Sequence, residues 1–500
     1  MSTAPTTIDD RTRLRPGDDD SAAVARAVAT AVAASERLAR MPRADRARLL
    51  ERIADGLEER RPDIVRTADE ETALGAGRLN GELTRTVYQL RFFADVVRDG
   101  AHLEAIIDHE GDTPMGPRPD LRRMLVPLGP VAVYAASNFP LAFSVAGGDT
   151  AAALAAGCAV VVKAHPAHRR TSELVHAVLT ATAEDAVGLV HGFEAGLDLV
   201  RAPEIRAASF TGSLAGGRAL ADLAAARPAP IPFYGELGSV NPMLVTPAAA
   251  QARAESIGEG LAASVALGGG QFCTKPGVVL VPAGPAGDAL VDRLRHSLAA
   301  VEPHPALTPG MAASYAEGVR ERASERGAEL LLRTPAPEGS TGPALLEVPG
   351  GDLPPLLREE CFGPVAVVSR YRDDAHAAAI ARTLPGTLTA SLFVADGDDG
   401  VPLARAALSA SAGRILYNGF PTGVAVAWAQ NHGGPWPSTD STHTSVGATS
   451  VRRFLRPVAW QNAPTSELPV ELRDGESDIP RRVDGVLVLG TRAAVPASRT

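Results

Sequence analysis

The chain has 500 residues, of which 45% are hydrophobic and 21% charged, with a net charge of −9 at pH 7. These values are typical of a globular protein of roughly two to four domains. The acidic balance argues against a nucleic-acid partner, and the three scattered cysteines, Cys158, Cys273 and Cys361, argue against a disulfide framework or a zinc site. We expect a cytoplasmic protein without a signal peptide, and no membrane contact, because the longest apolar stretch, Ala151 to Val162, spans only 12 residues.

The predicted elements begin with helices between Ser21 and Arg98, where apolar residues recur at helical spacing. From residue 126 to 245, and again from about 256 to 419, short apolar runs alternate with glycine-rich turns and alanine-rich stretches. This alternation predicts α/β domains with parallel sheets covered on both faces. The proline- and glycine-rich range 333–355 predicts a loop, and the chain after about residue 464 predicts a polar tail. The predicted strands are Val131–Tyr134, Ala159–Val162, Ala207–Phe210, Met243–Val245, Val278–Val281, Val365–Ser369 and Ser391–Val394.

Cys273 stands in the segment Gly-Gly-Gly-Gln-Phe-Cys-Thr-Lys-Pro-Gly, a loop in which the backbone can approach a ligand closely. A thiol in such a loop is either a nucleophile or a buried structural cysteine, and the loop alone leaves both interpretations open. Of the 49 basic residues only Lys163 and Lys275 are lysine, and Lys275 lies two residues after Cys273. These two lysines are either kept by accident or stand where arginine cannot serve.

Other candidate site residues follow predicted strands. Lys163 and Asn138 lie at the carboxyl edge of the first sheet, where α/β proteins bind ligands, and the amide of Asn138 is suited to donate to an oxyanion. Gly212 and Ser213 lie in a strand-to-helix turn that either binds a phosphate or is an ordinary tight turn. Glu236 lies among apolar and glycine residues, where we expect a raised pKa.

Six short motifs resemble the aldehyde dehydrogenase superfamily and follow one another in the order typical of that family, over roughly residues 21–464. Within it, Tyr417-Asn418-Gly-Phe-Pro-Thr-Gly and His432-Gly-Gly-Pro-Trp-Pro resemble the 2,5-dioxovalerate (α-ketoglutarate semialdehyde) dehydrogenase branch. A related NADP-dependent long-chain aldehyde dehydrogenase of luminous bacteria is similar in many of these sequence motifs. The six motifs are Ser-Asn138-Phe-Pro, Val-Val-Lys163-Ala-His-Pro, Phe-Thr-Gly212-Ser213, Glu236-Leu-Gly, Gly-Gln-Phe-Cys273 and Glu360-Cys-Phe362-Gly-Pro.

The resemblance implies that Cys273 attacks an aldehyde to form a thiohemiacetal, whose oxyanion accepts from the side chain of Asn138 and the backbone N–H of Cys273. Hydride transfer to a nicotinamide leaves a thioester, and Glu236 activates the water that hydrolyses it to a carboxylic acid. The 2,5-dioxovalerate branch implies 2,5-dioxopentanoate as the substrate and 2-oxoglutarate as the product. Lys275 is either an anchor for an anionic aldehyde or a support beside the cysteine loop.

The resemblance also implies a nicotinamide cofactor. Glu360 matches the position that binds the nicotinamide ribose, Phe362 lies near the ring, Ser213 near the pyrophosphate and Lys163 near the adenosine ribose. NAD-preferring relatives commonly have a glutamate where this chain has Pro166. The missing negative charge predicts NADP as the preferred cofactor, with NAD possible, and Arg169, Arg170 or Arg206 as partners of a 2′-phosphate.

The fold implied by the resemblance has a Rossmann-like cofactor domain, an α/β catalytic domain and a small oligomerisation β-extension. We expect a flexible tail over 1–20, the cofactor domain over 21–245 with an oligomerisation strand near 115–128, and the catalytic domain over 246–435. The range 436–465 then returns to the cofactor domain and the oligomerisation strand, before a tail over 466–500. A homodimer or homotetramer follows from the same resemblance.

Two alternatives to the 2,5-dioxovalerate activity remain open. One is a broad-specificity or fatty aldehyde dehydrogenase that uses NADP and the same catalytic residues. The other is a non-catalytic structural or binding protein on the same scaffold, which predicts loss of Cys273, Glu236 or Asn138, although all three are present.

Overall fold

Four helices open the described part of the chain, which runs from residue 19 to residue 491 in this computed structural model. The carboxylate of Asp20 caps the first helix by accepting from the backbone N–H of Ala23 at 2.8 Å. Because the described residues begin at residue 19, most of the tail expected over 1–20 lies outside them. The helices are α1 (Ser21–Arg40), α2 (Arg43–Glu59), α3 (Arg61–Thr72) and α4 (Ala76–Asp99), as the sequence predicts.

The first sheet has five parallel strands in the order β7-β6-β5-β8-β9. The predicted strands Val131–Tyr134, Ala159–Val162 and Ala207–Phe210 lie in this sheet. Met243–Val245 is also confirmed as a strand but belongs to the second sheet, and β7 and β9 were not predicted. The strand order reverses at β5, and this reversal opens a crevice at the carboxyl edge of the sheet. The elements are β5 (Val131–Tyr134), α5 (Gly148–Ala156), β6 (Val160–Lys163), α6 (Arg169–Ala183), β7 (Val187–Val190), α7 (Phe193–Arg201), β8 (Ala207–Thr211), α8 (Leu214–Ala225) and β9 (Phe233–Glu236).

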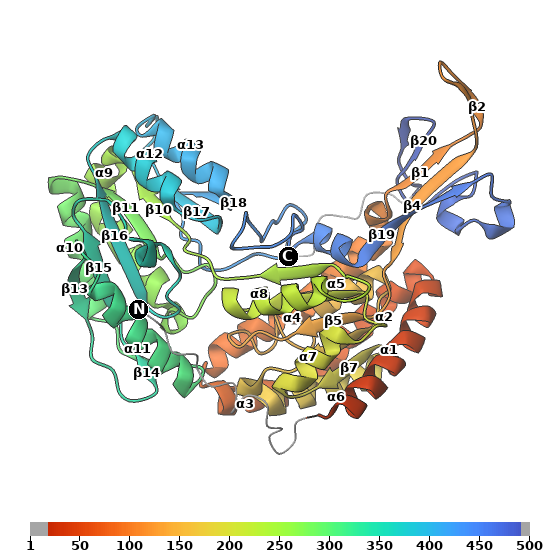
Figure 1. Cartoon of the computed structure of the whole chain (residues 1–500), viewed down its shortest axis with the longest axis horizontal. Coiled ribbons are helices and arrows are strands. Elements are labelled where there is room, and N and C mark those ends of the chain that lie inside the picture. The colour runs from red at the N-terminus through yellow and green to blue at the C-terminus, as the bar shows by residue number, and fades with distance from the viewer. Residues whose placement is uncertain (1–18, 492–500) are drawn as a thin grey trace.

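The second sheet has seven strands in the order β13-β15-β16-β11-β10-β17-β18, all parallel except β13. Apolar clusters cover both of its faces. Figure 1 shows this sheet and its helices as a separate lobe beside the lobe of the first sheet. The elements are β10 (Met243–Val245), α9 (Pro247–Ala266), β11 (Val278–Pro282), α10 (Pro285–Ala299), α11 (Pro309–Ala323), β13 (Glu329–Arg333), β15 (Ala344–Val348), β16 (Val365–Tyr371), α12 (Asp374–Thr383), β17 (Thr387–Phe393), α13 (Pro402–Ser411) and β18 (Ala412–Tyr417).

Two predictions about this region differ from the structure. The boundary predicted at residue 245 is too late, because β10 pairs with β11 and β17 and so belongs to the second sheet. The range 333–355 is not a plain loop, since β15 lies within it and pairs in parallel with β16. Its apolar run is short and is flanked by proline and glycine, which conceals the strand in the sequence.

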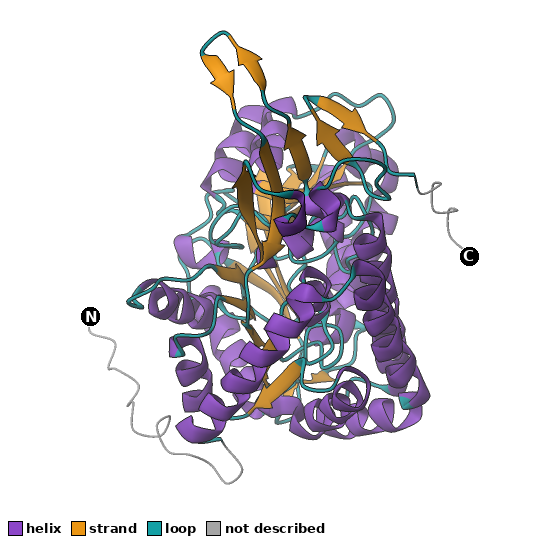
Figure 2. Cartoon of the chain, turned by 90° about the vertical axis from the view of Figure 1, so that its right-hand side faces the viewer, coloured by secondary structure: helices purple, strands orange, loops and turns teal. Residues whose placement is uncertain are grey.

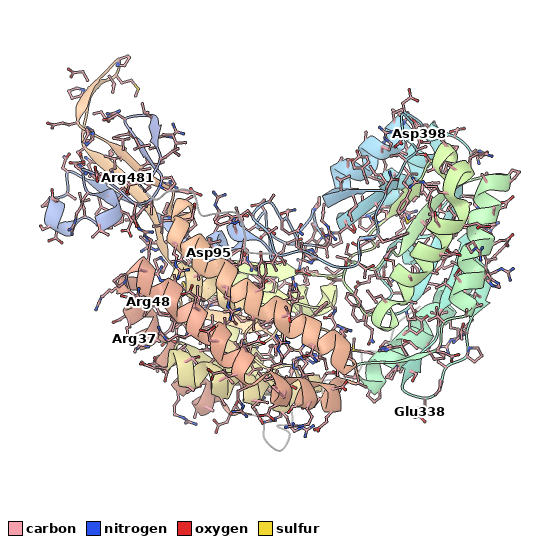
Figure 3. The ribbon with its side chains drawn as sticks, turned by 180° about the vertical axis from the view of Figure 1, so that it is seen from behind. Arg37, Arg48, Asp95, Glu338, Asp398 and Arg481 are labelled. Atoms are coloured by element: carbon pink, nitrogen blue, oxygen red, sulfur yellow. The ribbon has the colours of Figure 1, made fainter. Side chains whose placement is uncertain are left out.

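A third sheet, of order β19-β4-β1-β20-β21, projects from the first lobe and carries a hairpin of β2 and β3 at its tip (Figures 1 and 2). The polar tail predicted from residue 466 is wrong as far as residue 491, because β20 pairs with β1. Arg481, buried in this extension, donates to the carbonyls of Arg473 and Gly475, both at 2.6 Å (Figure 3). The strands are β1 (Ala105–Asp108), β2 (Gly111–Thr113), β3 (Gly116–Arg118), β4 (Leu121–Pro127), β19 (Leu455–Gln461), β20 (Arg481–Val483) and β21 (Val486–Val488).

Among residues 19–491, no helix combines the length and the apolar character that a membrane span requires.

Candidate active site

The loop that carries Cys273 is largely buried, but the cysteine itself stays partly accessible. Gly270, just before it, has a φ of 65°, and a Cβ there would lie 2.3 Å from the backbone of Gly363. The side-chain amide of Asn241 donates to the carbonyl of Cys273 at 2.7 Å and to that of Lys275 at 3.0 Å. These contacts hold the loop in one conformation.

Three side chains from distant parts of the chain meet at this thiol. The Sγ of Cys273 lies 3.7 Å from Nε2 of His432, which in turn lies 2.9 Å from Oε1 of Glu236. The hydroxyl of Ser445 donates to Oε2 of Glu236 at 2.5 Å. His432 and Glu236 have side chains only 0% and 2% exposed. We refer to Cys273, His432, Glu236 and Ser445 as the cysteine cluster.

The charges within the cysteine cluster are set by burial and by these contacts. Burial acts to raise the pKa of Glu236, but the charge of His432 and hydrogen bonds from His432 and Ser445 outweigh it and lower this pKa to about 2. The raised pKa expected for Glu236 is therefore wrong. Burial, followed by the negative charge of Glu236, raises the pKa of the Cys273 thiol well above its usual value. At neutral pH the cluster thus holds a carboxylate beside a protonated thiol.

The cluster also offers one possible metal ligand from each of Glu236, Cys273 and His432, with the three atoms within 4.8 Å of one another. Carboxylate, thiolate and imidazole are all ligands of zinc. The expectation that the site contains no metal stays a prediction.

Asn138 lies directly beside the cysteine loop. Its Nδ2 donates to the carbonyl of Gln271 at 3.0 Å, and its own carbonyl accepts from Arg78 at 2.6 Å. An amide nitrogen carries two N–H donors, so one donor remains for another acceptor. The structure therefore brings together Cys273, Glu236 and Asn138, the three residues expected to act in catalysis.

Lys275 lies two residues after Cys273 in the same loop, and its side chain is buried. Its buried ammonium donates to the carbonyl of Val365 at 2.7 Å. Burial lowers the pKa of Lys275 to about 8, and burial raises the pKa of nearby Glu360 to about 7, against the opposing charge of the lysine. A Cβ on Gly238 would lie 2.7 Å from Oε2 of Glu360, so this glycine leaves room for the carboxylate. The bond from Lys275 thus links the cysteine loop to the start of β16.

The residues expected to bind the cofactor gather at the carboxyl edge of the first sheet. Lys163 ends β6, and Pro166 is exposed just after it. Gly212 and Ser213 are exposed at the start of α8, where the Ser213 hydroxyl accepts from the backbone N–H of Gly216 at 3.2 Å. An open helix N-terminus beside the reversal of strand order suits a pyrophosphate. These residues fit a dinucleotide.

Glu360 and Phe362 reach this region from the second lobe, in the loop that precedes β16. The guanidinium of Arg322 donates to the carbonyls of Glu359 and Glu360 at 3.1 and 3.2 Å, which holds this loop in place. Phe362 is partly buried there. The residues expected to bind the cofactor therefore come from both lobes.

Only two of the three arginines proposed for a 2′-phosphate lie near this edge. Arg169 and Arg170 begin α6 and pair with Glu173 and Glu70, each at 3.0 Å. Arg206 comes directly before β8, so it lies at the amino edge of the parallel sheet, opposite Lys163. The expectation for Arg206 is therefore wrong.

The other two cysteines lie outside the cluster. Cys158 is completely buried, and its thiol donates to the carbonyl of Phe454 at 3.4 Å. Cys361 packs against the apolar core of the second sheet. Both positions agree with structural roles.

Three residues of the site had no predicted role. His432 begins a motif used only for the resemblance, and that motif was the available signal. Asn241 lies five residues after Glu236 in the same glycine-containing segment, and Ser445 stands in a serine- and threonine-rich stretch without any signal. Each of these contacts joins residues that are far apart in the sequence.

Comparisons with known proteins agree with this geometry. The model of the aldehyde dehydrogenase family matches residues 4–456. Alpha-ketoglutaric semialdehyde dehydrogenase 2 of Azospirillum brasilense is 46% identical over 89% of this chain and 88% of its own, and alpha-ketoglutaric semialdehyde dehydrogenase of Acinetobacter baylyi is 43% identical over 88% and 87%. The NADP-dependent glyceraldehyde-3-phosphate dehydrogenase of Bacillus halodurans, solved with NADP, shares the fold with a TM-score of 0.75 at 24% identity, covering 89% of this chain and 92% of its own. The chain therefore belongs to the aldehyde dehydrogenase family, as an enzyme that oxidises aldehydes with NAD(P).

Proposed function

We propose that the enzyme oxidises 2,5-dioxopentanoate to 2-oxoglutarate, consuming one water and one NAD(P)⁺ and releasing NAD(P)H and two protons. The observation that carries the catalytic assignment is the cysteine cluster, in which a thiol, an imidazole and a carboxylate are in contact. The names of the relatives from Azospirillum brasilense and Acinetobacter baylyi support the choice of substrate. A non-catalytic role lacks support, because all three expected catalytic residues are present and adjacent.

In the proposed reaction Cys273 attacks the aldehyde carbon, and its thiol proton passes to the Glu236 carboxylate. The remaining N–H of Asn138 and the backbone N–H of Cys273 donate to the oxyanion, and each such donor contributes ~3 kcal/mol in comparable sites. Bound NAD(P)⁺ supplies the hydride acceptor. Glu236 releases the thiol proton to solvent. It then takes a proton from the water that attacks the thioester and passes it to the departing Cys273 sulfur, while His432 and Ser445 hold its carboxylate in place.

We further propose that the enzyme prefers NADP to NAD. Pro166 places no carboxylate after β6, so nothing at that position repels a 2′-phosphate. Arg169 lies three residues further on, within the same turn of the chain, and its charge favours a phosphate. The NADP bound to the solved relative from Bacillus halodurans supports the assignment.

The proposal extends to assembly and location. Strands β19 and β21 are the two edges of the projecting sheet, and open edges of this kind are covered in assemblies by other chains. We therefore propose a homodimer or a homotetramer, and a cytoplasmic location to be checked by fractionation.

Steady-state kinetics test the substrate and the cofactor together. The panel compares 2,5-dioxopentanoate with hexanal and decanal, each with NAD and with NADP. We expect kcat/KM to be highest for 2,5-dioxopentanoate with NADP. A higher kcat/KM for decanal would replace this substrate with a fatty aldehyde, and a strong preference for NAD would remove the NADP assignment.

A further inference from the structure

One face of α4 carries polar side chains where a buried helix face is normally apolar. Arg78, Glu82, Arg85 and Gln89 are spaced four, three and four residues apart, and this spacing places them in one row along the helix. The outward face is different, since the side chain of Asp95, labelled in Figure 3, is 50% exposed and that of Arg91 is 51% exposed. The inward row is thus a built polar surface beside the cysteine loop.

Every member of this row has a buried polar atom without a hydrogen-bond partner among the described residues. In Arg78 and in Glu82 only one buried side-chain atom lacks such a hydrogen-bond partner. Arg78 donates its other terminal nitrogen to the carbonyl of Asn138 at 2.6 Å, and Glu82 accepts from the backbone N–H groups of Leu141 and Ala142 at 2.8 and 2.9 Å. Arg85 differs, because neither of its terminal nitrogens has a partner. The atoms are Nη1 of Arg78, Oε2 of Glu82, Nη1 and Nη2 of Arg85 and Nε2 of Gln89.

The guanidinium of Arg85 is close enough to the catalytic centre to interact with it. Its central carbon lies 4.9 Å from the centre of the Phe143 ring, five residues after Asn138. Burial lowers the pKa of Arg85, whereas the charges of Glu82, Glu236 and Cys273 act to raise it. Arg85 therefore lies within electrostatic range of Glu236 and Cys273.

A buried guanidinium without a hydrogen-bonded counter-ion is costly. Glu82 is a poor counter-ion, because its carboxylate is already held by the backbone of residues 141 and 142. The two free nitrogens of Arg85 form a fork that matches a carboxylate. A carboxylate ligand beside Arg85 would satisfy both nitrogens at once.

We propose that Arg85 binds the carboxylate of the substrate and so selects short anionic aldehydes over neutral ones. This inference rests on the proposed function, which supplies the aldehyde group and the thiol that it meets. Arg85 is a specificity-determining residue here and takes no part in the proton transfers of the cluster. Lys275, the other cation considered for this role, is held by the carbonyl of Val365.

The test measures KM and kcat of Arg85→Met, Arg85→Lys and the wild type with 2,5-dioxopentanoate and with hexanal. We expect Arg85→Met to raise KM for 2,5-dioxopentanoate by about 10- to 100-fold, the usual cost of losing a hydrogen-bonded charge, with kcat/KM for hexanal changed less than about threefold. Arg85→Lys retains the charge without the fork, so its KM should fall between those of the wild type and Arg85→Met. Arg91→Met, on the outward face of the same helix, is the matched control and should leave both substrates unchanged.

The outcomes separate the two levels of the proposal. If Arg85 acted only through the fold or through the Cys273 thiolate, Arg85→Met would slow hexanal and 2,5-dioxopentanoate equally, and this result overturns the role of Arg85. The role of Arg85 is likewise overturned if Arg85→Met changes the kinetics of neither substrate. If the wild type itself shows no preference for 2,5-dioxopentanoate over hexanal, the proposed substrate falls. Inhibition of hexanal oxidation by 2-oxoglutarate in the wild type, lost in Arg85→Met, provides independent support.

Discussion

The thiol and the carboxylate of the cysteine cluster oppose each other's charges. Burial and then the charge of Glu236 keep the pKa of Cys273 high. Because the thiolate is the form that alkylating agents and oxidants attack, the resting enzyme is protected from both. Glu236 accordingly has two effects: its negative charge disfavours ionisation of Cys273, and it is placed to take the proton when an aldehyde arrives.

Replacing Glu236 by glutamine should therefore make Cys273 more reactive towards iodoacetamide, even though it abolishes most of the turnover. Without the negative charge the pKa of Cys273 falls, so the alkylation rate at neutral pH rises and its pH midpoint moves down. The alkylation rate of Cys273 is measured in the wild type from the loss of activity over time. In both proteins it is measured by mass spectrometry of the labelled peptide. Cys361, which is partly accessible, serves as the internal control. An unchanged or higher midpoint contradicts this account of the cluster.

The residues proposed to act in catalysis differ in how far the sequence could identify them. Cys273, Glu236 and Asn138 each stand in a short motif, so their types and neighbours were sufficient. His432 is separated from Glu236 by 196 positions, and only the fold brings the two into contact. The same contact explains the wrong pKa direction for Glu236, because the sequence indicates burial but not the donors that outweigh it.

Among the secondary-structure elements, α8 has the most direct link to cofactor binding. Its N-terminus is exposed at the carboxyl edge of the first sheet, and the hydroxyl of Ser213 caps it. Thr308 caps α11 in the second lobe in the same way, with the same distance of 3.2 Å to the backbone N–H of Met311. The two caps form a natural pair for comparison.

Ser213→Ala and Thr308→Ala should each lower the free energy of unfolding by about 1 kcal/mol, the usual cost of losing a cap. Only Ser213→Ala should also raise KM for NADP severalfold, because the loosened turn lies where the pyrophosphate is expected. Urea unfolding and initial-rate kinetics measure the two effects. A rise in KM of the same size in Thr308→Ala would remove the link between this turn and the cofactor.

The elements best predicted from the sequence are those with continuous apolar runs or regular helical spacing, such as β5, β10 and α2. Strands β15 and β20 escaped prediction for different reasons. β15 lies between proline- and glycine-rich turns, whereas β20 (Arg481–Val483) contains two arginines and is defined by pairing with β1. Pairing with a distant partner leaves no periodic signal in a strand of three residues.

For the whole molecule, the projecting sheet is the feature that a single chain leaves unexplained. Strand β21 is an edge strand whose three residues are all exposed, with Leu487 at 58%, and Leu489 just after it is 75% exposed. An apolar, exposed edge tends to pair with other chains. The proposed homo-oligomer gives this edge a partner.

Leu487→Glu should therefore shift the enzyme to a smaller species in size-exclusion chromatography with light scattering. Leu330→Glu, at an exposed position on the edge strand β13 of the other lobe, is the matched control and should keep the wild-type mass. A wild-type enzyme with the mass of one chain at micromolar concentration contradicts the proposed assembly.

The cysteine cluster has a consequence for exchanging parts between related enzymes. Glu236 ends the first sheet, Cys273 belongs to the second lobe, and His432 and Ser445 come from the segment that returns to the first. A chimera cut at a lobe boundary, near residue 242, would inherit the base from one parent and the residues that hold it from the other. Such hybrids can keep both lobes intact and still lose the reaction, so recombination has to treat these three separated segments as one heritable unit.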